Sequence, residues 1–274
     1  SALLDLTNPE SEKWFKGELD GLIKDYGVDG FKLDAGDGRF YKGIKSLKEV
    51  NPNKHTELFA KIGLSYPYNE YRATWKMGGQ PLVQRLHDKS HDWEDLKKLI
   101  PHMLLEGIMG YPFSCPDMIG GGQFTSFLDD APIDQELVVR STQVHALMPM
   151  MQFSVAPWRI LDKRHFKAVL DAVNTRNRFK ETILNLAKKA STNGEPIVRS
   201  MEYVFPHKGY VDITDQFMLG NSILVAPYLS KGEGSRKVVL PKGAWKSDTG
   251  KVYKGGKTIT INVSLTRLPY FIKE

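Results

Sequence analysis

Residues 28–34 read Val-Asp-Gly-Phe-Lys-Leu-Asp, a short and mostly apolar run that ends on a carboxylate. Upstream of it, apolar residues recur at helical spacing between Asn8-Pro9 and Gly27. Asn is a good helix N-cap, Pro fits the first helical position, and Gly fits the C-cap. Together with a strand-like stretch at residues 3–7, this pattern predicts a strand–helix–strand unit, which is typical of parallel α/β architecture.

The alternation of strand and helix patterns continues to about residue 190. Short apolar runs predict strands at 71–74, 82–86, 111–115 and 147–155. Apolar residues at helical spacing predict helices from about residue 92, over 133–144, and over 163–190 with a stop near Gly194. Pro101 should kink or interrupt the helix that begins near residue 92.

The pattern changes from about residue 213, where no segment with helical spacing remains. Apolar or alternating runs at 223–225, 238–240 and 258–263 are separated by turns rich in Gly, Pro, Asp and Lys. We therefore expect a second, all-β domain at the C-terminal end of the chain.

The 274 residues carry 38 Lys and Arg against 32 Asp and Glu, a net charge of +6. Residues 231–257 hold eight Lys/Arg and two Asp/Glu, so the whole surplus lies in that segment. A basic patch on one short segment is a weaker nucleic-acid signal than a basic domain. We expect solvated lysines that discourage pairing at the edges of a β-sheet, ahead of docking onto an acidic partner and ahead of nucleic-acid binding.

Other features of the composition exclude further classes. The single cysteine, Cys115, cannot form an intramolecular disulfide, and no run approaches the roughly 20 apolar residues of a membrane-spanning helix. We expect no nucleic-acid partner, no membrane partner, no cofactor and no metal. His87 and His91 lack a third partner at metal-ligand spacing. The sequence does not identify a cellular compartment.

Polar side chains follow the predicted strands at the places where each strand ends. They are Asp34 and Asp37, His87 and Asp88, and Asp117, and Arg72 stands inside the strand predicted at 71–74. In α/β barrels the carboxyl ends of the strands form the active site, and two carboxylates there can divide the work of glycosidic cleavage. Asp is also common at strand ends because it caps helices and forms turns.

Several of these stretches resemble glycoside hydrolase family 31, the retaining α-glycosidases. Residues 30–37, Gly-Phe-Lys-Leu-Asp-Ala-Gly-Asp, look like the nucleophile motif of that family. Residues 87–93, His-Asp-Lys-Ser-His-Asp-Trp, are similar to its acid/base segment, and Arg72 matches the arginine that precedes that segment. Residues 115–121 resemble its Asp-Ile-Gly-Gly stretch. The resemblance continues in family order through residues 194–199, 216–220, 223–227 and 240–245.

The resemblance implies an α/β fold in which a (β/α)8 TIM-barrel segment, residues 1–212, precedes a small all-β sandwich, residues 213–274. It implies that Asp34 is the nucleophile and Asp88 the general acid and later the general base. A retaining enzyme holds such a pair about 5–5.5 Å apart. Lys32 and Arg72 are expected to favour the ionised form of Asp34 through opposite charge. The remaining expected substrate-binding residues are Trp75, for stacking on a sugar face, His87 and Asp117.

Departures from the common family pattern bear on the substrate. Many glucosidases of the family have Trp at the position of Lys32, and Met-Asn-Glu at the position of residues 35–37. The segment that usually ends Phe-Arg-Asn-His reads Met-Gln-Phe-Ser at residues 151–154, so a substrate-binding histidine is missing. Lysine at position 32 resembles the xylosidase branch of the family, whereas Lys-Leu-Asp-Ala-Gly at residues 32–36 together with His-Asp-Lys-Ser at residues 87–90 looks closer to a branch linked to α-galactosides. We therefore expect an exo-acting α-galactosidase first, with an α-xylosidase or α-glucosidase as the alternatives. A non-catalytic carbohydrate-binding or regulatory relative is the competing class.

The strands predicted before the β-domain are too few to close an eight-stranded barrel. We therefore expect this chain to be the C-terminal portion of a larger enzyme that works with a separate or missing N-terminal part. The expected partners are an oligosaccharide or glycoside substrate and that N-terminal part. A homo-oligomer is also compatible with the sequence.

Overall fold

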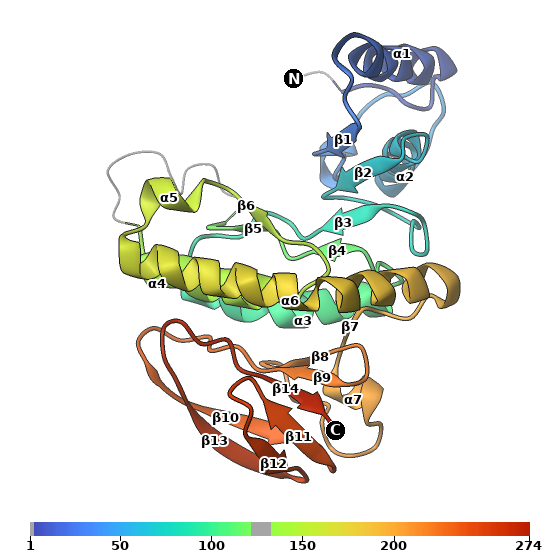
Figure 1. Ribbon diagram of the computed structural model, residues 1–274. Helices are drawn as coiled ribbons and strands as arrows, with labels where there is room; N and C mark the ends of the chain where they lie inside the picture. The colour runs from blue at the N-terminus through green and yellow to red at the C-terminus, as the bar shows by residue number, and fades with distance from the viewer. Residues whose placement is uncertain (1–2, 122–132) are drawn as a thin grey trace. The chain divides into compact units, whose positions relative to one another are not determined.

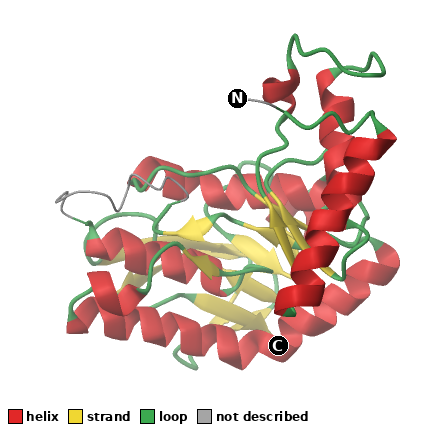
Figure 2. Ribbon diagram, turned by 90° about the horizontal axis from the view of Figure 1, so that it is seen from above, coloured by secondary structure: helices red, strands yellow, loops and turns green. Residues whose placement is uncertain are grey.

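The structure is a computed structural model that describes residues 3–121 and 133–274. The chain forms two compact units, residues 1–87 and residues 88–274. Figure 1 labels their helices and strands, and Figure 2 distinguishes the two kinds of element by colour.

The first unit contains a parallel sheet in the order β1-β2-β3. Its elements are α1 (Pro9–Tyr26), β1 (Gly30–Leu33), η1 (Gly38–Tyr41), α2 (Pro52–Gly63), β2 (Tyr68–Tyr71) and β3 (Val83–Arg85). Helix α1 begins where the Asn8 side chain accepts a hydrogen bond from the Glu10 amide, and it ends at Gly27 with φ of 66°. Both ends therefore follow the predicted capping residues.

The strand predicted at residues 3–7 is wrong. The side chain of Asp5 instead builds a turn, because its Oδ1 accepts hydrogen bonds from the amide and the hydroxyl of Thr7 at 3.0 and 2.6 Å. Its Oδ2 accepts a hydrogen bond from the amide of Leu47 at 2.6 Å. A short side chain that bonds nearby backbone competes with a strand ladder, and periodicity alone does not reveal this.

The second unit opens with helices joined by very short strands. They are α3 (Trp93–Ile108), β4 (Ser114–Cys115), β5 (Met118–Ile119), α4 (Gln135–Ala146), β6 (Gln152–Phe153), α5 (Pro157–Ile160) and α6 (Lys163–Asn193). Figure 1 shows α3, α4 and α6 side by side. Helix α3 runs through Pro101 without a break.

Two of the strands predicted in this region are only two residues long. Prolines 112 and 116 flank β4, and Pro149 precedes β6. Proline lacks the amide hydrogen that a strand ladder needs, so these apolar runs pair only briefly. Strands β5 and β6 pair in parallel.

The C-terminal part of the second unit is an all-β assembly with one helical turn. Its elements are β7 (Val198–Arg199), α7 (Met201–Val204), β8 (Phe217–Leu219), β9 (Ile223–Val225), β10 (Gly234–Leu240), β11 (Ala244–Ser247), β12 (Val252–Lys254), β13 (Lys257–Val263) and β14 (Tyr270–Lys273). Six strands form one sheet in the order β12-β11-β14-β9-β8-β7, and β10 pairs with β13 separately. The six-stranded sheet thus includes β7, which lies ahead of residue 213.

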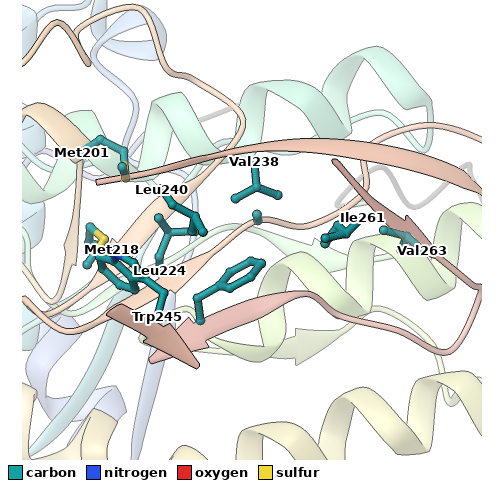
Figure 3. Packing of buried hydrophobic residues seen from close by; sticks show 10 residues of the cluster. Met201, Met218, Leu224, Val238, Leu240, Trp245, Ile261 and Val263 are labelled. Atoms are coloured by element: carbon teal, nitrogen blue, oxygen red, sulfur yellow. The ribbon is translucent and has the colours of Figure 1, made fainter. Parts of the chain in front are cut away.

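The core of this β-assembly lies between its two sheets. Trp245, Phe271 and Leu224 are fully buried there, packed with Val238 and Leu240 of β10 (Figure 3). The indole of Trp245 donates its only hydrogen bond to the Pro241 carbonyl at 2.8 Å, so its burial leaves no polar group unsatisfied. Among the described residues, no helix combines the length and apolar character needed to cross a membrane.

Candidate functional site

The parallel strands of the first unit bring polar residues to one edge of the sheet. In the ladder Lys32 lies opposite Glu70, and Tyr71 lies opposite Gln84. The next positions along the three strands are Asp34 after β1, Arg72 after β2 and Arg85 at the end of β3. The carboxyl ends of parallel strands are where α/β folds place their ligands.

Two guanidinium groups contact the same oxygen of Asp34. Nη1 of Arg72 lies 3.5 Å from Asp34 Oδ1, and Nη2 of Arg85 lies 3.3 Å from it. Arg72 also binds Oδ2 of Asp37 at 2.9 Å through its other nitrogen. The Asp34 side chain is 55% exposed, whereas that of Arg85 is 2% exposed. The site therefore presents an accessible carboxylate against a buried, fixed positive charge.

Lys32 joins this cluster through a second carboxylate. Its Nζ lies 3.2 Å from Oε1 of Glu70, and Nε of Arg85 lies 3.6 Å from the same oxygen. The ion pair of Lys32 is thus with its cross-strand neighbour Glu70. The expected support of Asp34 by Lys32 stays a prediction.

Sequence analysis missed Arg85 and Glu70. Arg85 is only 1% exposed, and it stands inside the apolar run that predicted β3. A charge within a buried strand needs an opposite charge beside it, and that requirement was the signal available in the sequence. Glu70 carried no comparable signal, because its role follows only from the register of β2 against β1 and β3.

The backbone that follows Asp34 turns sharply. Ala35 and Gly36 both have left-handed φ, at 63° and 76°. A Cβ on Gly36 would lie 2.4 Å from a ring carbon of Phe59 on α2, and the Gly36 carbonyl accepts a 2.7 Å hydrogen bond from Thr56 of the same helix. Helix α2 therefore holds the turn in place and leaves no room for a side chain at residue 36.

Trp75 and His87 lie outside this charge cluster in the first unit. Trp75 is 43% exposed on the loop between β2 and β3, next to Lys76 with its left-handed φ of 57°. His87 is exposed just after β3. Both side chains are accessible, as substrate-binding residues must be, and their expected roles stay predictions.

Asp88 begins the second unit, on the segment that leads into α3. Its side chain is half-buried, and the next residue, Lys89, is 4% exposed. The amide of Lys89 donates a 2.7 Å hydrogen bond to Oδ2 of Asp117, which is itself 1% exposed. The structure thus gives Asp117 a backbone partner next to Asp88, and its expected contact with substrate stays a prediction.

A buried histidine supports Asp117 from α4. Nε2 of His145 lies 3.2 Å from the Asp117 carbonyl oxygen, and its Nδ1 lies 2.7 Å from the Ser141 carbonyl. Burial lowers the pKa of His145 to about 4. The ring is therefore neutral near pH 7.

The expected site residues fall into two groups. Lys32, Asp34, Arg72, Trp75 and His87 belong to the first unit, and Asp88 and Asp117 belong to the second. The pairing of Asp34 with Asp88 stays a prediction. In the described ranges, no group of three His, Cys, Asp or Glu side chains is arranged to hold a metal ion.

Comparison with known proteins identifies the family. Residues 1–184 match the TIM-barrel domain of glycosyl hydrolases family 31, and residues 194–274 match the C-terminal domain of the same family. The myogenesis-regulating glycosidase of Mus musculus is 33% identical over 98% of this chain. The SITS-binding protein of Tetronarce californica is 28% identical over 99%. In both cases the chain spans only 40% of the relative's length.

A solved structure shows the same fold. The GH31 dextranase of Flavobacterium johnsoniae superposes with a TM-score of 0.87 at 22% identity, over 98% of this chain and 37% of that chain. The expected α/β fold, a TIM-barrel segment followed by a β-sheet domain, is confirmed. The chain belongs to glycosyl hydrolase family 31 and carries a segment of its TIM barrel together with its C-terminal domain.

Proposed function

We propose that this chain contributes the two catalytic carboxylates of a retaining exo-α-glycosidase. The observation that carries the proposal is the accessible carboxylate of Asp34, which meets Arg72 and Arg85 at the carboxyl ends of parallel strands. A nucleophilic carboxylate must be both held in place and open to the substrate. The two arginine contacts of Asp34 and its exposure serve these two needs.

The proposed reaction has two displacements at the anomeric carbon. Asp34 forms a bond to that carbon while the glycosidic bond breaks, and Asp88 gives its proton to the departing oxygen. Water then attacks the glycosyl–Asp34 ester, gives a proton to Asp88 and releases Asp34. Two inversions return the α-anomer, and both carboxyl groups regain their starting forms.

We propose α-galactosides as the first substrates to test, with α-xylosides and α-glucosides as the alternatives. Lys32 supports this order, because it stands on β1 beside Asp34 where many glucosidases of the family have tryptophan. Its side chain is 41% exposed and so remains within reach of a ligand. Residues 151–154 also lack the histidine that the common pattern uses for a sugar hydroxyl.

The relatives are longer than this chain, and their additional length bears on how the sugar-binding pocket is completed. Because the chain spans 40% of the mouse relative, we propose that barrel strands outside residues 1–274 complete the sugar-binding pocket. Experiments on activity therefore use the full-length protein that contains this sequence.

Two variants separate the proposed roles. Asp34→Ala and Asp88→Ala should each reduce hydrolysis of nitrophenyl α-glycosides at least about 100-fold. Added azide should then restore turnover with opposite stereochemistry. Without Asp34, a single displacement yields the β-glycosyl azide. Without Asp88, the glycosyl–Asp34 ester still forms from a good leaving group, and azide yields the α-glycosyl azide.

Asp29→Asn provides the matched control, because Asp29 is an exposed aspartate just before β1. It should keep wild-type activity. Unchanged hydrolysis in the Asp34 and Asp88 variants, or the same azide anomer from both, would contradict the assignment.

A second candidate function is carbohydrate binding without catalysis. The relative from Tetronarce californica, 28% identical over 99% of this chain, supports a role without catalysis, because its name gives the binding of SITS and no enzymatic activity. A binding protein would retain saturable affinity for α-glycosides, measured by calorimetry, while the wild-type protein released no free sugar. Detectable wild-type turnover that depends on Asp34 excludes this candidate.

A further inference from the structure

The backbone of Lys89, the residue directly after Asp88, has a close neighbour at its amide and another at its carbonyl. The Lys89 amide donates a 2.7 Å hydrogen bond to Oδ2 of Asp117. At the carbonyl of the same residue, a Cβ added to Gly121 would lie 2.8 Å from the Lys89 oxygen. Asp117 therefore holds the peptide that joins Asp88 to Lys89, and the Gly121 backbone packs against the next peptide.

The side chain of Lys89 provides another anchor. Its Nζ lies 2.9 Å from Nδ1 of His102 on α3, and the residue is 4% exposed. Burial lowers the pKa of Lys89. A buried amine depends on its hydrogen bonds, so the contact with His102 ties the segment after Asp88 to the body of α3.

Asp117 is itself tightly fixed. It has a left-handed φ of 78°, a conformation that is strained for a residue with a side chain and persists only where the surroundings impose it. Its carbonyl oxygen meets Nε2 of His145 at 3.2 Å and Sγ of Cys115 at 3.5 Å. The carboxylate that holds the Lys89 amide therefore comes from a rigid support.

We propose that Asp117 is a positioning residue for Asp88, and that it sets the direction of the general acid through the Lys89 amide, with Lys89, His102 and Gly121 as the supporting contacts. This inference rests on the proposed role of Asp88. It assigns Asp117 a task that differs from substrate contact. General acid catalysis requires the carboxyl to reach the departing oxygen within hydrogen-bond distance, so a small displacement of the backbone is costly.

The test compares substrates that need a proton with substrates that do not. Asp117→Ala should reduce kcat/KM for phenyl and alkyl α-glycosides about 10–100-fold, since their leaving oxygens need protonation. The kcat/KM for the corresponding α-glycosyl fluoride or dinitrophenyl glycoside should fall no more than about 3-fold, since these groups leave without a strong acid and kcat/KM does not include the later step in which Asp88 acts as base. Asp117→Asn keeps an oxygen for the Lys89 amide and should restore most of the lost rate.

Gly121→Ala acts on the same residue, Lys89, at its carbonyl, which belongs to the next peptide bond. The new methyl group would displace the Lys89 carbonyl, so the same dependence on the leaving group is expected even if the Asp117→Ala variant fails to fold. Asp162→Ala is the matched control. Asp162 also accepts a backbone hydrogen bond, from His165 at 2.9 Å, but its side chain caps α6 and, within the described residues, bonds only residues of that helix.

The control should keep the wild-type dependence on the leaving group. An equal loss on all substrates in the folded Asp117 and Gly121 variants would overturn the inference and leave the proposed function standing. A wild-type protein that hydrolyses none of these substrates would instead overturn the proposed function.

Discussion

At the scale of single residues, Arg85 is the centre of the charge cluster in the first unit. It lies between two carboxylates, with Glu70 at 3.6 Å and Asp34 at 3.3 Å, and its side chain is 2% exposed. Removal of one member of a buried ion pair leaves the other charge in a poorly solvated place. Arg85 therefore links the stability of β3 to the electrostatics of the proposed nucleophile.

The substitution Arg85→Met should lower the free energy of unfolding by about 3–5 kcal/mol, because Glu70 loses its buried partner. Lys32→Met is the matched comparison, since Lys32 contacts the same Glu70 oxygen but is 41% exposed. It should cost no more than about 1 kcal/mol. Urea unfolding measures the free energy of unfolding of both variants. Equal losses in the two variants would show that Arg85 is no more important to this cluster than Lys32.

His145 should make stability depend on pH. Unfolded histidine takes up a proton below about pH 6.5, whereas burial holds the folded pKa of His145 at about 4. The unfolded state therefore binds more protons between these values. The contribution of neutral His145 to the free energy of unfolding is fully present above about pH 6.5. That free energy should fall by about 3 kcal/mol as the pH drops to 4.

The variant His145→Gln isolates this contribution. It should unfold with a flatter dependence on pH between 6.5 and 4, measured by urea unfolding at a series of pH values. An unchanged slope would show that His145 does not carry the effect.

At the scale of elements, the turn after β1 decides where Asp34 points. Gly36 has φ of 76° and lies against Phe59, whereas Gly43 has φ of 71° and no atom within 4 Å of an added Cβ. Gly43→Ala therefore measures backbone strain alone, at about 1 kcal/mol. Gly36→Ala adds a clash with α2.

We expect Gly36→Ala to cost at least about 2 kcal/mol more than Gly43→Ala in urea unfolding, a difference typical of overpacked interiors. It should also reduce hydrolysis, because Asp34 is two residues away from the displaced backbone. Equal stability of the two variants would contradict the contact with Phe59 as the constraint on this turn.

Prediction from sequence succeeded where local chemistry decides an element. Helix α1 begins after its N-cap Asn8 and ends at its C-cap Gly27. Helix α6 ends at its C-cap Gly194, which has φ of 73°. Prediction failed at residues 3–7, where the Asp5 side chain replaces a ladder by a turn. It also overestimated the lengths of β4 and β6. Nearby prolines shorten the strand pairing of these apolar runs, although the runs stay apolar and look like strands in the sequence.

The residues of the candidate site also divide into those that the sequence predicts and those that it does not. Strand ends and a family resemblance predict Asp34, Arg72 and Asp88 as site residues. The structure brings Arg72 to Asp34, and their catalytic and binding roles stay predictions. Arg85 and Glu70 were missed because their contacts depend on strand register, which brings together residues 15 positions apart. The role of Asp117 depends on a hydrogen bond to a backbone amide 28 residues away, and no residue pattern encodes that bond.

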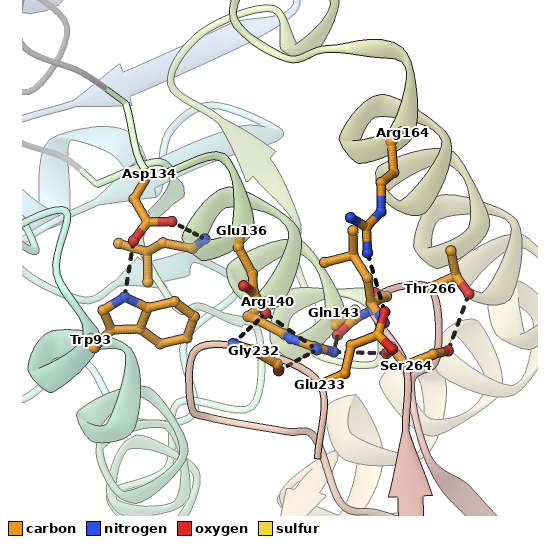
Figure 4. A network of polar contacts seen from close by, with 12 residues as sticks. Trp93, Asp134, Glu136, Arg140, Gln143, Arg164, Gly232, Glu233, Ser264 and Thr266 are labelled. Atoms are coloured by element: carbon orange, nitrogen blue, oxygen red, sulfur yellow. Dashed lines mark hydrogen bonds and ion pairs between the residues drawn. The ribbon is translucent and has the colours of Figure 1, made fainter.

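At the scale of the whole molecule, a buried network joins the barrel helices of the second unit to its β-assembly. Arg140 of α4 is 0% exposed, and it donates to the carbonyls of Ser264 at 3.1 Å and Gly232 at 3.2 Å (Figure 4). Gln143, one turn later, donates to the Leu265 carbonyl at 2.7 Å. These bonds attach loops of the β-assembly to α4.

Arg140→Met should therefore destabilise the second unit by about 3–5 kcal/mol, because the carbonyls of Ser264 and Gly232 and the carboxylate of Glu136 lose a buried guanidinium together. Arg164→Met removes an exposed ion pair with Glu233 at 3.2 Å in the same region, and it should cost no more than about 1 kcal/mol. Thermal or urea unfolding that ranks the two variants equally would contradict the importance of the buried network.

We propose that Asp34 forms a covalent bond to the sugar. A 5-fluoro α-glycosyl fluoride, built on the sugar that the full-length protein hydrolyses fastest, tests for this bond. Such a sugar forms the glycosyl–enzyme ester and slows its hydrolysis, so the ester can be located by mass spectrometry of proteolytic peptides. We predict one added glycosyl group on the peptide that contains Asp34, and none in Asp34→Ala. A modified peptide elsewhere in the chain, or turnover of the reagent without any modified peptide, would contradict the assignment of Asp34 as the nucleophile.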